Sequence, residues 1–282
     1  MLTHKMKLLV IVSLLCVTGA LADAAGTAIW RSMQVRIDTK SERAFSGRIV
    51  GGFMAAITSF PYQLSLRRFD HHACGASVID SKWAVTAAHC MLPSISTEFL
   101  TVKGGSANRT DGEGVIFPVS EVIIHPTFNP NTYHNDIALL RIEGTFDGIA
   151  NLAPIALQTS PISVGPFNIV YCVVTGWGLT NIYSDELPEI LRAVRIPLVP
   201  YTECRRKWSP TLVTPSMTCA GEPRRDSCNG DSGGPLVCNN QLFGLVSWGA
   251  SQCGNSYPGV YTSIPSKEVL SFIGQYVDVE RR

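Results

Sequence analysis

The chain reads Asp-Ser-Cys-Asn-Gly-Asp-Ser-Gly-Gly-Pro from residue 226 to residue 235. Glycines on both sides of Ser232 lack a Cβ, so the backbone of another chain can approach the serine closely. Two further motifs lie upstream, Thr86-Ala-Ala-His89-Cys90 and Asn135-Asp136-Ile-Ala-Leu-Leu140. Amide hydrolysis needs a nucleophile, a base that takes its proton and a group that fixes the tautomer of that base. Ser232, His89 and Asp136 are the candidates for these three roles.

The order of the three candidates along the chain separates structural classes. Histidine comes first, aspartate second and serine last, which differs from the order in α/β-hydrolases and in subtilisin-like enzymes. Each motif alone could be an ordinary loop or packed segment. The interpretation therefore depends on all three motifs occurring together.

Short segments of alternating polar and apolar residues, separated by Gly, Pro, Asn and Asp, make up most of the chain from Ile49 onward. Many short strands with frequent turns predict an all-β fold, either a barrel or a sandwich. The expected strands include residues 62–66, 82–86, 115–124, 137–142, 171–175 and 241–248.

One helix is expected at the end of the chain. Apolar residues recur there at helical spacing, and Ser266 is a plausible N-cap after Pro265. The apolar positions are Val269, Phe272, Ile273, Tyr276 and Val277.

Residues 1–22 have the three parts of a secretory signal peptide. Lys5 and Lys7 form a basic start, an apolar run extends from Leu8 to Val17, and Ala20-Leu21-Ala22 is a small-x-small cleavage site. The alternative is a membrane anchor, but a helix that spans a bilayer needs about 20 apolar residues. We therefore expect a secreted, extracellular protein.

Residues 23–48 contain no cysteine and end in a polar stretch with scattered charges. Such a segment cannot bury enough apolar surface for a core of its own, and we interpret it as a pro-segment. The remaining residues, 49–282, are expected to form the functional domain.

The cysteines agree with secretion. Of nine, Cys16 lies in the expected signal peptide, and eight remain. An even number in a secreted chain indicates disulfides, although eight cysteines allow many pairings. No Cys-x-x-Cys pair occurs, which argues against a structural zinc site.

Composition excludes several classes of protein. The chain of 282 residues is 45% hydrophobic and 16% charged, which excludes a disordered or fibrous protein. Its formal net charge is +1, so electrostatics predict binding neither to nucleic acid nor to a membrane surface.

Residues 49–282 resemble the chymotrypsin-fold serine proteases, and the trypsin family in particular. The three motifs and four further segments occur in the order of that family: Ile49-Val-Gly-Gly52, Cys172-Val-Val-Thr-Gly-Trp177-Gly, Ser247-Trp248-Gly249 and Pro258-Gly-Val-Tyr261. The resemblance implies an all-β fold of two antiparallel six-stranded β-barrels, over 49–160 and 161–265, with a C-terminal α-helix. It also implies a monomeric serine endopeptidase without a cofactor.

The resemblance implies a role for each candidate. Ser232 would be the nucleophile, His89 the general base and then acid, and Asp136 the residue that orients His89. The backbone N–H groups of Gly230 and Ser232 would form the oxyanion hole.

Specificity would depend on Asp226, six residues before Ser232, where the family has the floor of its primary pocket. A carboxylate at the end of an apolar slot pairs with the charge of Arg or Lys. An aromatic side chain in the same slot would remove water from the carboxylate without offering it a partner. Substrates would therefore be proteins or peptides cut after Arg or Lys. Further substrate-binding residues implied by the resemblance are Ser227, Ser247, Trp248, Gly249 and Gly259.

Activation would require cleavage after Arg48. The new amine of Ile49 would then pair with Asp231 inside the protein and order the pocket. In the precursor, His72 matches a position that holds Asp231. An activating protease, with the enzyme itself as one candidate, and protein protease inhibitors are therefore expected partners.

The family's pairing selects one set of disulfides: Cys74–Cys90, Cys172–Cys238, Cys204–Cys219 and Cys228–Cys253. The first would hold His89 through its neighbour, and the last would tie two walls of the pocket together.

The sequence departs from the family at two places. Between Cys219 and Asp226 it is shorter than usual, which leaves the shape of that loop open. Residues 104–114 lack the acidic spacing of a calcium loop, so we expect no metal. That segment contains the sequon Asn108-Arg-Thr110, and the histidines outside the motifs, His71, His72, His125 and His134, are expected to be loop or surface residues.

Three alternatives remain. Chymotrypsin-like or elastase-like specificity is disfavoured by Asp226, and an inactive binding module by the presence of all three catalytic candidates. A cascade or processing protease of narrow substrate range often carries a disulfide-bonded extra module. Residues 23–48 have no cysteine for one, so digestion or general proteolysis is the preferred role.

Overall fold

Six antiparallel strands in the first half of the described chain close into a barrel. The structure is a computed structural model, and it describes residues 51–110, 112–165, 167–180 and 186–279. All of these belong to one unit, which runs from Phe45 to Arg282. The strands of the first barrel, in the order in which they pair, are β2 (Gln63–Arg68), β3 (His71–Val78), β4 (Trp83–Thr86), β7 (Ala138–Ile142), β6 (Val115–Ile124) and β5 (Leu100–Gly104).

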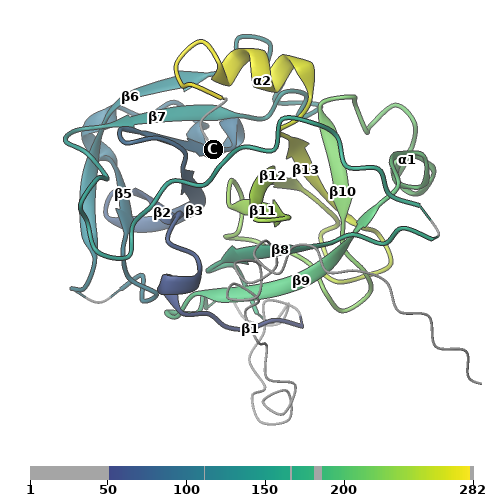
Figure 1. Cartoon of the computed structure of the whole chain (residues 1–282), viewed down its shortest axis with the longest axis horizontal. Helices are drawn as coiled ribbons and strands as arrows, with labels where there is room; N and C mark the ends of the chain where they lie inside the picture. The colour runs from purple at the N-terminus through teal and green to yellow at the C-terminus, as the bar shows by residue number, and fades with distance from the viewer. Residues whose placement is uncertain (1–50, 111, 166, 181–185, 280–282) are drawn as a thin grey trace, which may run out of the picture. The chain divides into compact units, whose positions relative to one another are not determined.

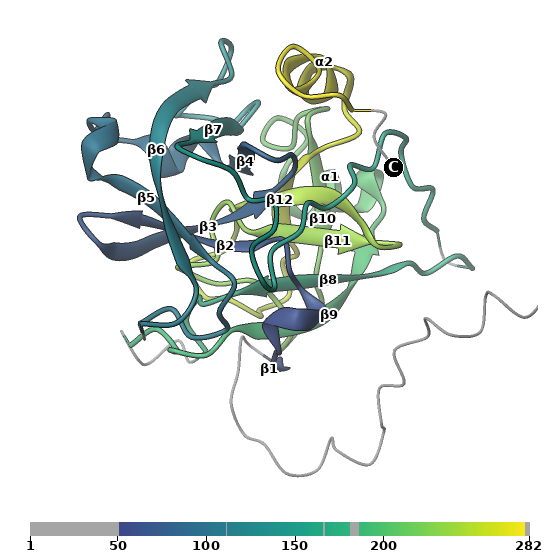
Figure 2. The same cartoon turned by 60° about the vertical axis from the view of Figure 1, so that its left-hand side comes forward.

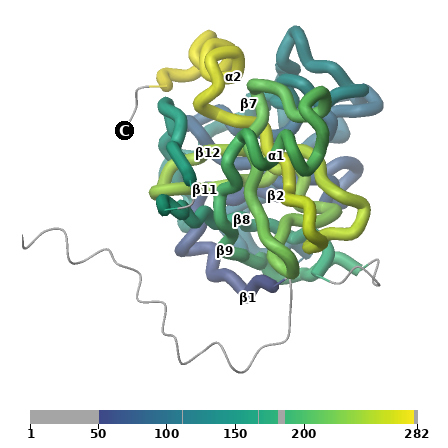
Figure 3. Tube along the Cα trace, turned by 90° about the vertical axis from the view of Figure 1, so that its right-hand side faces the viewer, coloured from purple at the N-terminus to yellow at the C-terminus, as the bar shows by residue number. Residues whose placement is uncertain are grey.

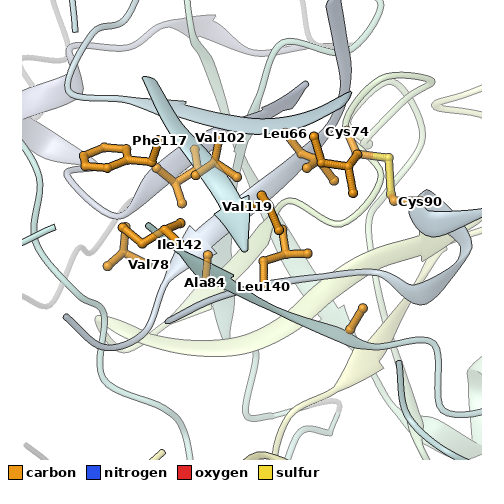
Figure 4. Close-up of a cluster of buried hydrophobic side chains, with 14 of the residues drawn as sticks. Leu66, Cys74, Val78, Ala84, Cys90, Val102, Phe117, Val119, Leu140 and Ile142 are labelled. Carbon is orange, nitrogen blue, oxygen red and sulfur yellow. A yellow bond between two sulfur atoms is a disulfide. The ribbon is translucent and has the colours of Figure 1, made fainter. Parts of the chain in front are cut away.

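The interior of the first barrel is filled by aliphatic side chains from all six strands (Figure 4). Leu64 and Leu66 on β2, two residues apart, are both fully buried, as expected where alternate residues share one face of a strand. Phe117 and Phe146 meet edge to face inside this cluster, with ring centroids 4.9 Å apart. The apolar residues of the alternating pattern in the sequence are therefore those that face the inside of the barrel.

Six more strands close a second barrel, to the right of the first in Figure 1. In the order in which they pair, they are β8 (Tyr171–Gly176), β9 (Arg192–Val199), β10 (Met217–Ala220), β13 (Gly259–Ser263), β12 (Gln241–Trp248) and β11 (Pro235–Cys238). These two closed barrels confirm the fold class predicted from the sequence.

The expected boundary between the barrels is wrong at one strand. β1 (Phe53–Met54) lies in the range assigned to the first barrel, but it pairs with β9 of the second, with Phe53 opposite Ala193. Its two residues do not show a strand pattern by themselves. The pairing is possible because β10 pairs only with Leu198 and Val199 at one end of β9. The backbone groups at the other end of that edge can therefore pair with β1.

Helix α2 (Lys267–Ile273) covers the seam between the barrels (Figures 1 and 2). Val269, Phe272 and Ile273 pack in one cluster with residues of β4 and β7 from the first barrel and of β11 and β12 from the second. Burial of this helix face therefore stabilises the relative position of the two barrels.

The predicted helix is correct in position but shorter than its apolar pattern. Ser266 occupies the N-cap with extended backbone, yet its hydroxyl makes no capping hydrogen bond. Tyr276 and Val277 follow the helix in a turn, and Val277 is still buried. Gly274, the C-cap, ends the helix.

A second helix, α1 (Tyr201–Trp208), was not predicted from the sequence (Figure 3). It is short and mostly polar, so no apolar stripe marks it. Contacts distant in sequence hold it: Cys204 is bonded to Cys219, and the indole N–H of Trp208 donates to the carbonyl of Pro258 at 2.8 Å.

Three 3₁₀ helices complete the described elements: η2 (Ile57–Ser59), η3 (Ala88–Met91) and η4 (Thr97–Phe99).

The structure contains the disulfides Cys74–Cys90, Cys172–Cys238, Cys204–Cys219 and Cys228–Cys253, the pairs that the resemblance implies. Over the described residues, neither helix has the length and apolar character needed to cross a membrane.

Candidate active site

His89 and Asp136 are joined by two hydrogen bonds. His89 lies in η3, directly after β4, and Asp136 lies just before β7, the strand that pairs with β4. Nδ1 of His89 is 2.7 Å from Oδ2 of Asp136, and the backbone N–H of His89 donates to Oδ1 at 2.9 Å. A carboxylate only accepts, so Nδ1 carries the hydrogen and Nε2 is left with a lone pair. The pair is thus arranged so that Nε2 can take a proton.

Asp136 receives two further hydrogen bonds from the second barrel. Ser247 on β12 donates its hydroxyl hydrogen to Oδ2 at 2.6 Å, and Thr262 on β13 donates to the backbone carbonyl of Asp136 at 2.7 Å. The side chain of Asp136 is fully buried. The sequence assigned Ser247 to substrate binding only, and no local pattern marks its contact with a residue in the other barrel.

Ser232 lies in the turn before β11 and is held against the first barrel. Its carbonyl accepts from the backbone N–H of Gly75 on β3 at 2.8 Å. Gly75 follows Cys74, whose disulfide partner Cys90 follows His89. Gly233, with φ of +74°, permits this approach, because a Cβ there would collide with Thr86 and the backbone of Gly75. One disulfide and one hydrogen bond therefore connect Ser232 with the segment that carries His89.

The turn before Ser232 leaves backbone N–H groups available. Within the described part of the chain, no hydrogen bond uses the N–H of Gly230 or of Ser232. Gly230 has φ of +96°, and a Cβ there would lie 2.9 Å from a methyl group of Leu187. Its carbonyl accepts from Nε2 of His72 at 3.0 Å, which fixes the peptide between Gly230 and Asp231. Two free donors near a serine are what an oxyanion hole requires.

Asp231 is fully buried beneath this turn. Its carboxylate accepts from the N–H of Gly178 at 2.7 Å and from the N–H of Cys228 at 2.9 Å. Burial raises the pKa of Asp231 to about 6, although both backbone hydrogen bonds act in the opposite direction. Arg48 and Ile49, its expected activation partners, lie outside the described residues.

His72 does not bond to Asp231 in this structure, contrary to the expectation for a precursor. Its Nδ1 lies 2.7 Å from the hydroxyl of Ser65, and its Nε2 contacts the carbonyl of Gly230. Burial lowers the pKa of His72 to about 4, so the ring is neutral at pH 7. A neutral ring that donates from Nε2 can accept from Ser65 at Nδ1, which satisfies both contacts.

Asp226 is a buried carboxylate with an incomplete set of partners. The residue is 5% exposed, and Oδ2 accepts from the N–H of Gly254 at 3.2 Å. Oδ1 is buried and has no hydrogen-bond partner among the described residues. Burial raises the pKa of Asp226 to about 7, and the charge of Asp231 adds to that rise. Such a group is expected to bind a donor from outside.

Gly259 lies beside the carboxylate of Asp226, and Gly249 lies beside Gly259. A Cβ on Gly259 would lie 2.8 Å from Oδ1 of Asp226, and one on Gly249 would lie 3.9 Å from the Cα of Gly259. The hydroxyl of Ser227 is 3.2 Å from that of the buried Tyr261. A side chain at residue 259 would therefore collide with the carboxylate of Asp226.

Trp248, the remaining expected pocket residue, is half-buried. Its ring packs against that of Trp208 on α1, with centroids 4.9 Å apart.

The short loop between Cys219 and Asp226, which departs from the family, closes as a tight turn. Glu222 and Arg225 exchange backbone hydrogen bonds, and the N–H of Arg224 donates to the carbonyl of Gly254 at 2.7 Å.

One group of metal-binding atom types occurs among the described residues, formed by Cys74, His89 and Cys90. Its two sulfurs are bonded to each other, so neither is a thiolate that could bind a metal. The residues do not fit a metal centre.

Comparison with known proteins agrees with this geometry. The profile of the family described as Trypsin matches residues 49–273. Trypsin alpha-4 of Lucilia cuprina is 40% identical over 255 residues, which are 90% of this chain and 93% of that protein. Trypsin of Sus scrofa is 37% identical over 221 residues, 77% of this chain and 91% of that protein.

A solved structure is also similar. Neuropsin, a serine protease expressed in the limbic system of mouse brain, superposes with a TM-score of 0.72 at 30% identity, covering 80% of this chain and 99% of that one. The fold and these similarities define a serine endopeptidase of the chymotrypsin fold. Within that class, the chain belongs to the trypsin family.

Proposed function

We propose that this protein hydrolyses peptide bonds after Arg or Lys through an acyl-enzyme formed on Ser232. The observation that carries the specificity is Asp226, whose buried Oδ1 has no hydrogen-bond partner among the described residues. A cationic side chain that enters beside Gly249 and Gly259 supplies both the missing donor and the missing counter-charge.

The hydrogen bonds between His89 and Asp136 support the acylation step. The hydroxyl oxygen of Ser232 attacks the carbonyl carbon of the substrate while Nε2 of His89 takes the hydroxyl proton. Asp136 holds the hydrogen on Nδ1 and stabilises the imidazolium that forms. The C–N bond then breaks, and the amine leaves with the proton from Nε2.

Deacylation repeats these steps with water. His89 takes a proton from water, the resulting hydroxide attacks the ester carbon, and Ser232 leaves with the proton. In both halves, negative charge collects on the carbonyl oxygen, where the free N–H groups of Gly230 and Ser232 can donate to it. Removing one such donor typically costs about 3 kcal/mol of transition-state stabilisation.

The preference for basic residues has an energetic basis. An Arg side chain offers two charge-assisted hydrogen bonds to a carboxylate, whereas Lys acts as a point charge, with the hydroxyl of Ser227 as a neighbour. A Phe or Leu in the same place leaves the carboxylate desolvated and unpaired, a penalty of several kcal/mol. At about 1.4 kcal/mol per tenfold, we expect discrimination of about a thousandfold or more in kcat/KM.

Secretion and activation are part of the proposal. Residues 1–22 are proposed to direct secretion, and cleavage after Arg48 to release residues 23–48. The Ile49 amine then pairs with Asp231 and orders the turn before Ser232. The trypsin names of the relatives support digestion or general proteolysis as the role.

The decisive measurement is kcat/KM on matched peptides that differ only at the residue before the scissile bond. The native enzyme should prefer Arg and Lys, and Asp226→Ser should lose that preference. A native preference for Phe, or an unchanged preference in Asp226→Ser, would refute the specificity. A peptide library screened with the same enzyme then separates broad digestion from a narrow processing role.

Two further variants test the chemistry and the activation. A serine-directed phosphonylating reagent should label Ser232, and Ser232→Ala should abolish hydrolysis. The Arg48→Gln precursor should remain inactive after treatment with trypsin, whereas the native precursor becomes active. Turnover in Ser232→Ala, or activity of the Arg48→Gln precursor, contradicts the respective step.

A further inference from the structure

The segment from Tyr133 to Asp136 contacts His89 with its first and last residues. The ring of Tyr133 packs edge to face on the imidazole, with centroids 5.4 Å apart, and Asp136 bonds to Nδ1. Two of these residues have positive φ, +57° for Tyr133 and +52° for Asn135. Such backbone is uncommon for a bulky residue such as Tyr133, although Asn adopts it more readily, and it persists where surrounding contacts hold it. The segment therefore needs a support.

Asn135 provides part of that support. It is fully buried, and the two hydrogens of Nδ2 have acceptors in the hydroxyl of Thr127, at 2.9 Å, and Oε2 of Glu268, at 2.7 Å. Its backbone N–H donates to the hydroxyl of Ser216 at 3.2 Å. Glu268 belongs to the first turn of α2 and Ser216 to the segment before β10, so distant parts of the chain meet at this one residue.

His134 provides the other part. Its Nε2 lies 3.2 Å from the same Oε2 of Glu268, and its Nδ1 lies 3.0 Å from the hydroxyl of Ser216 and 3.1 Å from that of Thr214. Nε2 of His134 also lies 3.2 Å from Nδ2 of Asn135, but both hydrogens of Nδ2 already have acceptors, so Nε2 carries a hydrogen that it donates to Glu268. One carboxylate oxygen thus accepts from two consecutive residues directly before Asp136.

We propose that Glu268 and His134 are positioning residues for catalysis, which hold the turn that places Asp136 and Tyr133 against His89. This inference rests on the proposed role of Asp136. Glu268 and His134 act through the backbone of residues 133–136, and neither is hydrogen-bonded to His89. Helix α2 therefore contributes to the geometry of the active site as well as to the seam between the barrels.

Glu268→Ala is the direct test, because the side chain of Glu268 is 58% exposed and its removal leaves the core intact. We expect kcat to fall about fivefold or more with KM unchanged, since a misplaced Asp136 weakens proton transfer and leaves substrate binding intact. Glu268→Gln retains an oxygen acceptor and should keep most of kcat. Lys267→Ala, the exposed neighbour on α2, is the matched control and should match the native enzyme.

Coupling between the two residues sharpens the test. If both hold the same turn, the double variant Glu268→Ala/His134→Ala should lose little more kcat than the worse single variant. The inference is overturned if the fold-loss of kcat in the double variant equals the product of the two single fold-losses. It is also overturned if kcat is unchanged in Glu268→Ala, or if Glu268→Gln loses as much kcat as Glu268→Ala. So does a rise in KM that accounts for the whole loss.

Asp136→Asn separates this inference from the proposed function. Loss of turnover in Asp136→Asn together with native turnover in Glu268→Ala refutes only the positioning role. Native turnover in Asp136→Asn refutes the proposed role of Asp136 itself, and with it the basis of the inference.

Discussion

The hydroxyl of Ser247 lies 2.6 Å from Oδ2 of Asp136, although 111 residues separate them in the chain. A carboxylate that belongs to the first barrel thus receives a hydrogen bond from the second. Since Oδ2 is also the atom that contacts Nδ1 of His89, the position of the imidazole depends on how the two barrels meet.

We predict that Ser247→Ala lowers kcat by about tenfold and also lowers the unfolding temperature by several degrees. The variant removes one of the donors to a fully buried carboxylate, and a hydrogen bond to a charged group is worth about 1.5–3 kcal/mol. Steady-state kinetics on an Arg peptide measures the effect. Ser77→Ala is the matched control, because the hydroxyl of Ser77 is also buried but has no described partner, and its kcat should be native.

Binding of an aromatic amidine should depend on pH through Asp226. The pKa of Asp226 is raised to about 7 by burial, so below pH 7 the carboxyl is mostly protonated and must lose its proton to bind a cation. We expect affinity to be constant above about pH 8 and to fall about tenfold per pH unit below 7. Isothermal titration calorimetry across this range checks it.

Asp226→Asn is the control for that titration. It should bind the amidine weakly at every pH, because the amide carries no charge. A native affinity that does not change between pH 8 and pH 5 would show that no group with a pKa near 7 controls the binding, and an Asp226→Asn variant that binds as tightly as the native enzyme would show that Asp226 is not the group that binds the cation.

Stability at acid pH should depend on His72. Its pKa is lowered to about 4 by burial, below the ordinary value of 6.5, so between these values the unfolded chain binds a proton that the folded protein excludes. The contribution of His72 to stability is therefore complete above about pH 6.5 and is lost progressively as pH falls toward 4. His72→Asn should flatten this part of the curve of unfolding temperature against pH.

The neighbouring His71→Asn is the matched control, because His71 is exposed. It should keep the slope of the native protein. Measurements in a Ser232→Ala background prevent self-digestion during heating. Equal slopes for His72→Asn and His71→Asn would contradict the assignment of the acid sensitivity to His72.

The disulfides Cys228–Cys253 and Cys204–Cys219 should differ in function more than in stability. They close loops of similar length, with separations of 25 and 15 residues, so replacing either pair by alanine should cost about 3 kcal/mol. Only the first ties the segment of Asp226 to Gly254, which donates to that carboxylate. Its loss should raise KM for Arg peptides several-fold more, as parallel denaturant melts and kinetics would show.

Local patterns were sufficient for parts of the fold. The strands at 115–124 and 241–248 have the expected bounds, and α2 begins after Ser266 as expected. In the strand at 115–124, the buried residues Phe117 and Val119 are two residues apart, as one face of a strand requires, whereas residues 242–247 of the other strand are buried on both faces. The pattern could not reveal α1, whose polar sequence carries no apolar stripe and whose contacts come from Cys219 and Pro258.

The sequence by itself determined the residue types and their order, which include His89, Asp136, Asp226 and Ser232. These follow from chemistry that needs particular functional groups and from motifs that are short and local. Tertiary structure alone decided that Ser247 donates to Asp136, that His72 bonds to Gly230 in place of Asp231, and that Glu268 accepts from two residues beside Asp136. The physical reason is that a hydrogen bond has a range of about 3 Å, whereas these partners are 111 to 158 residues apart along the chain.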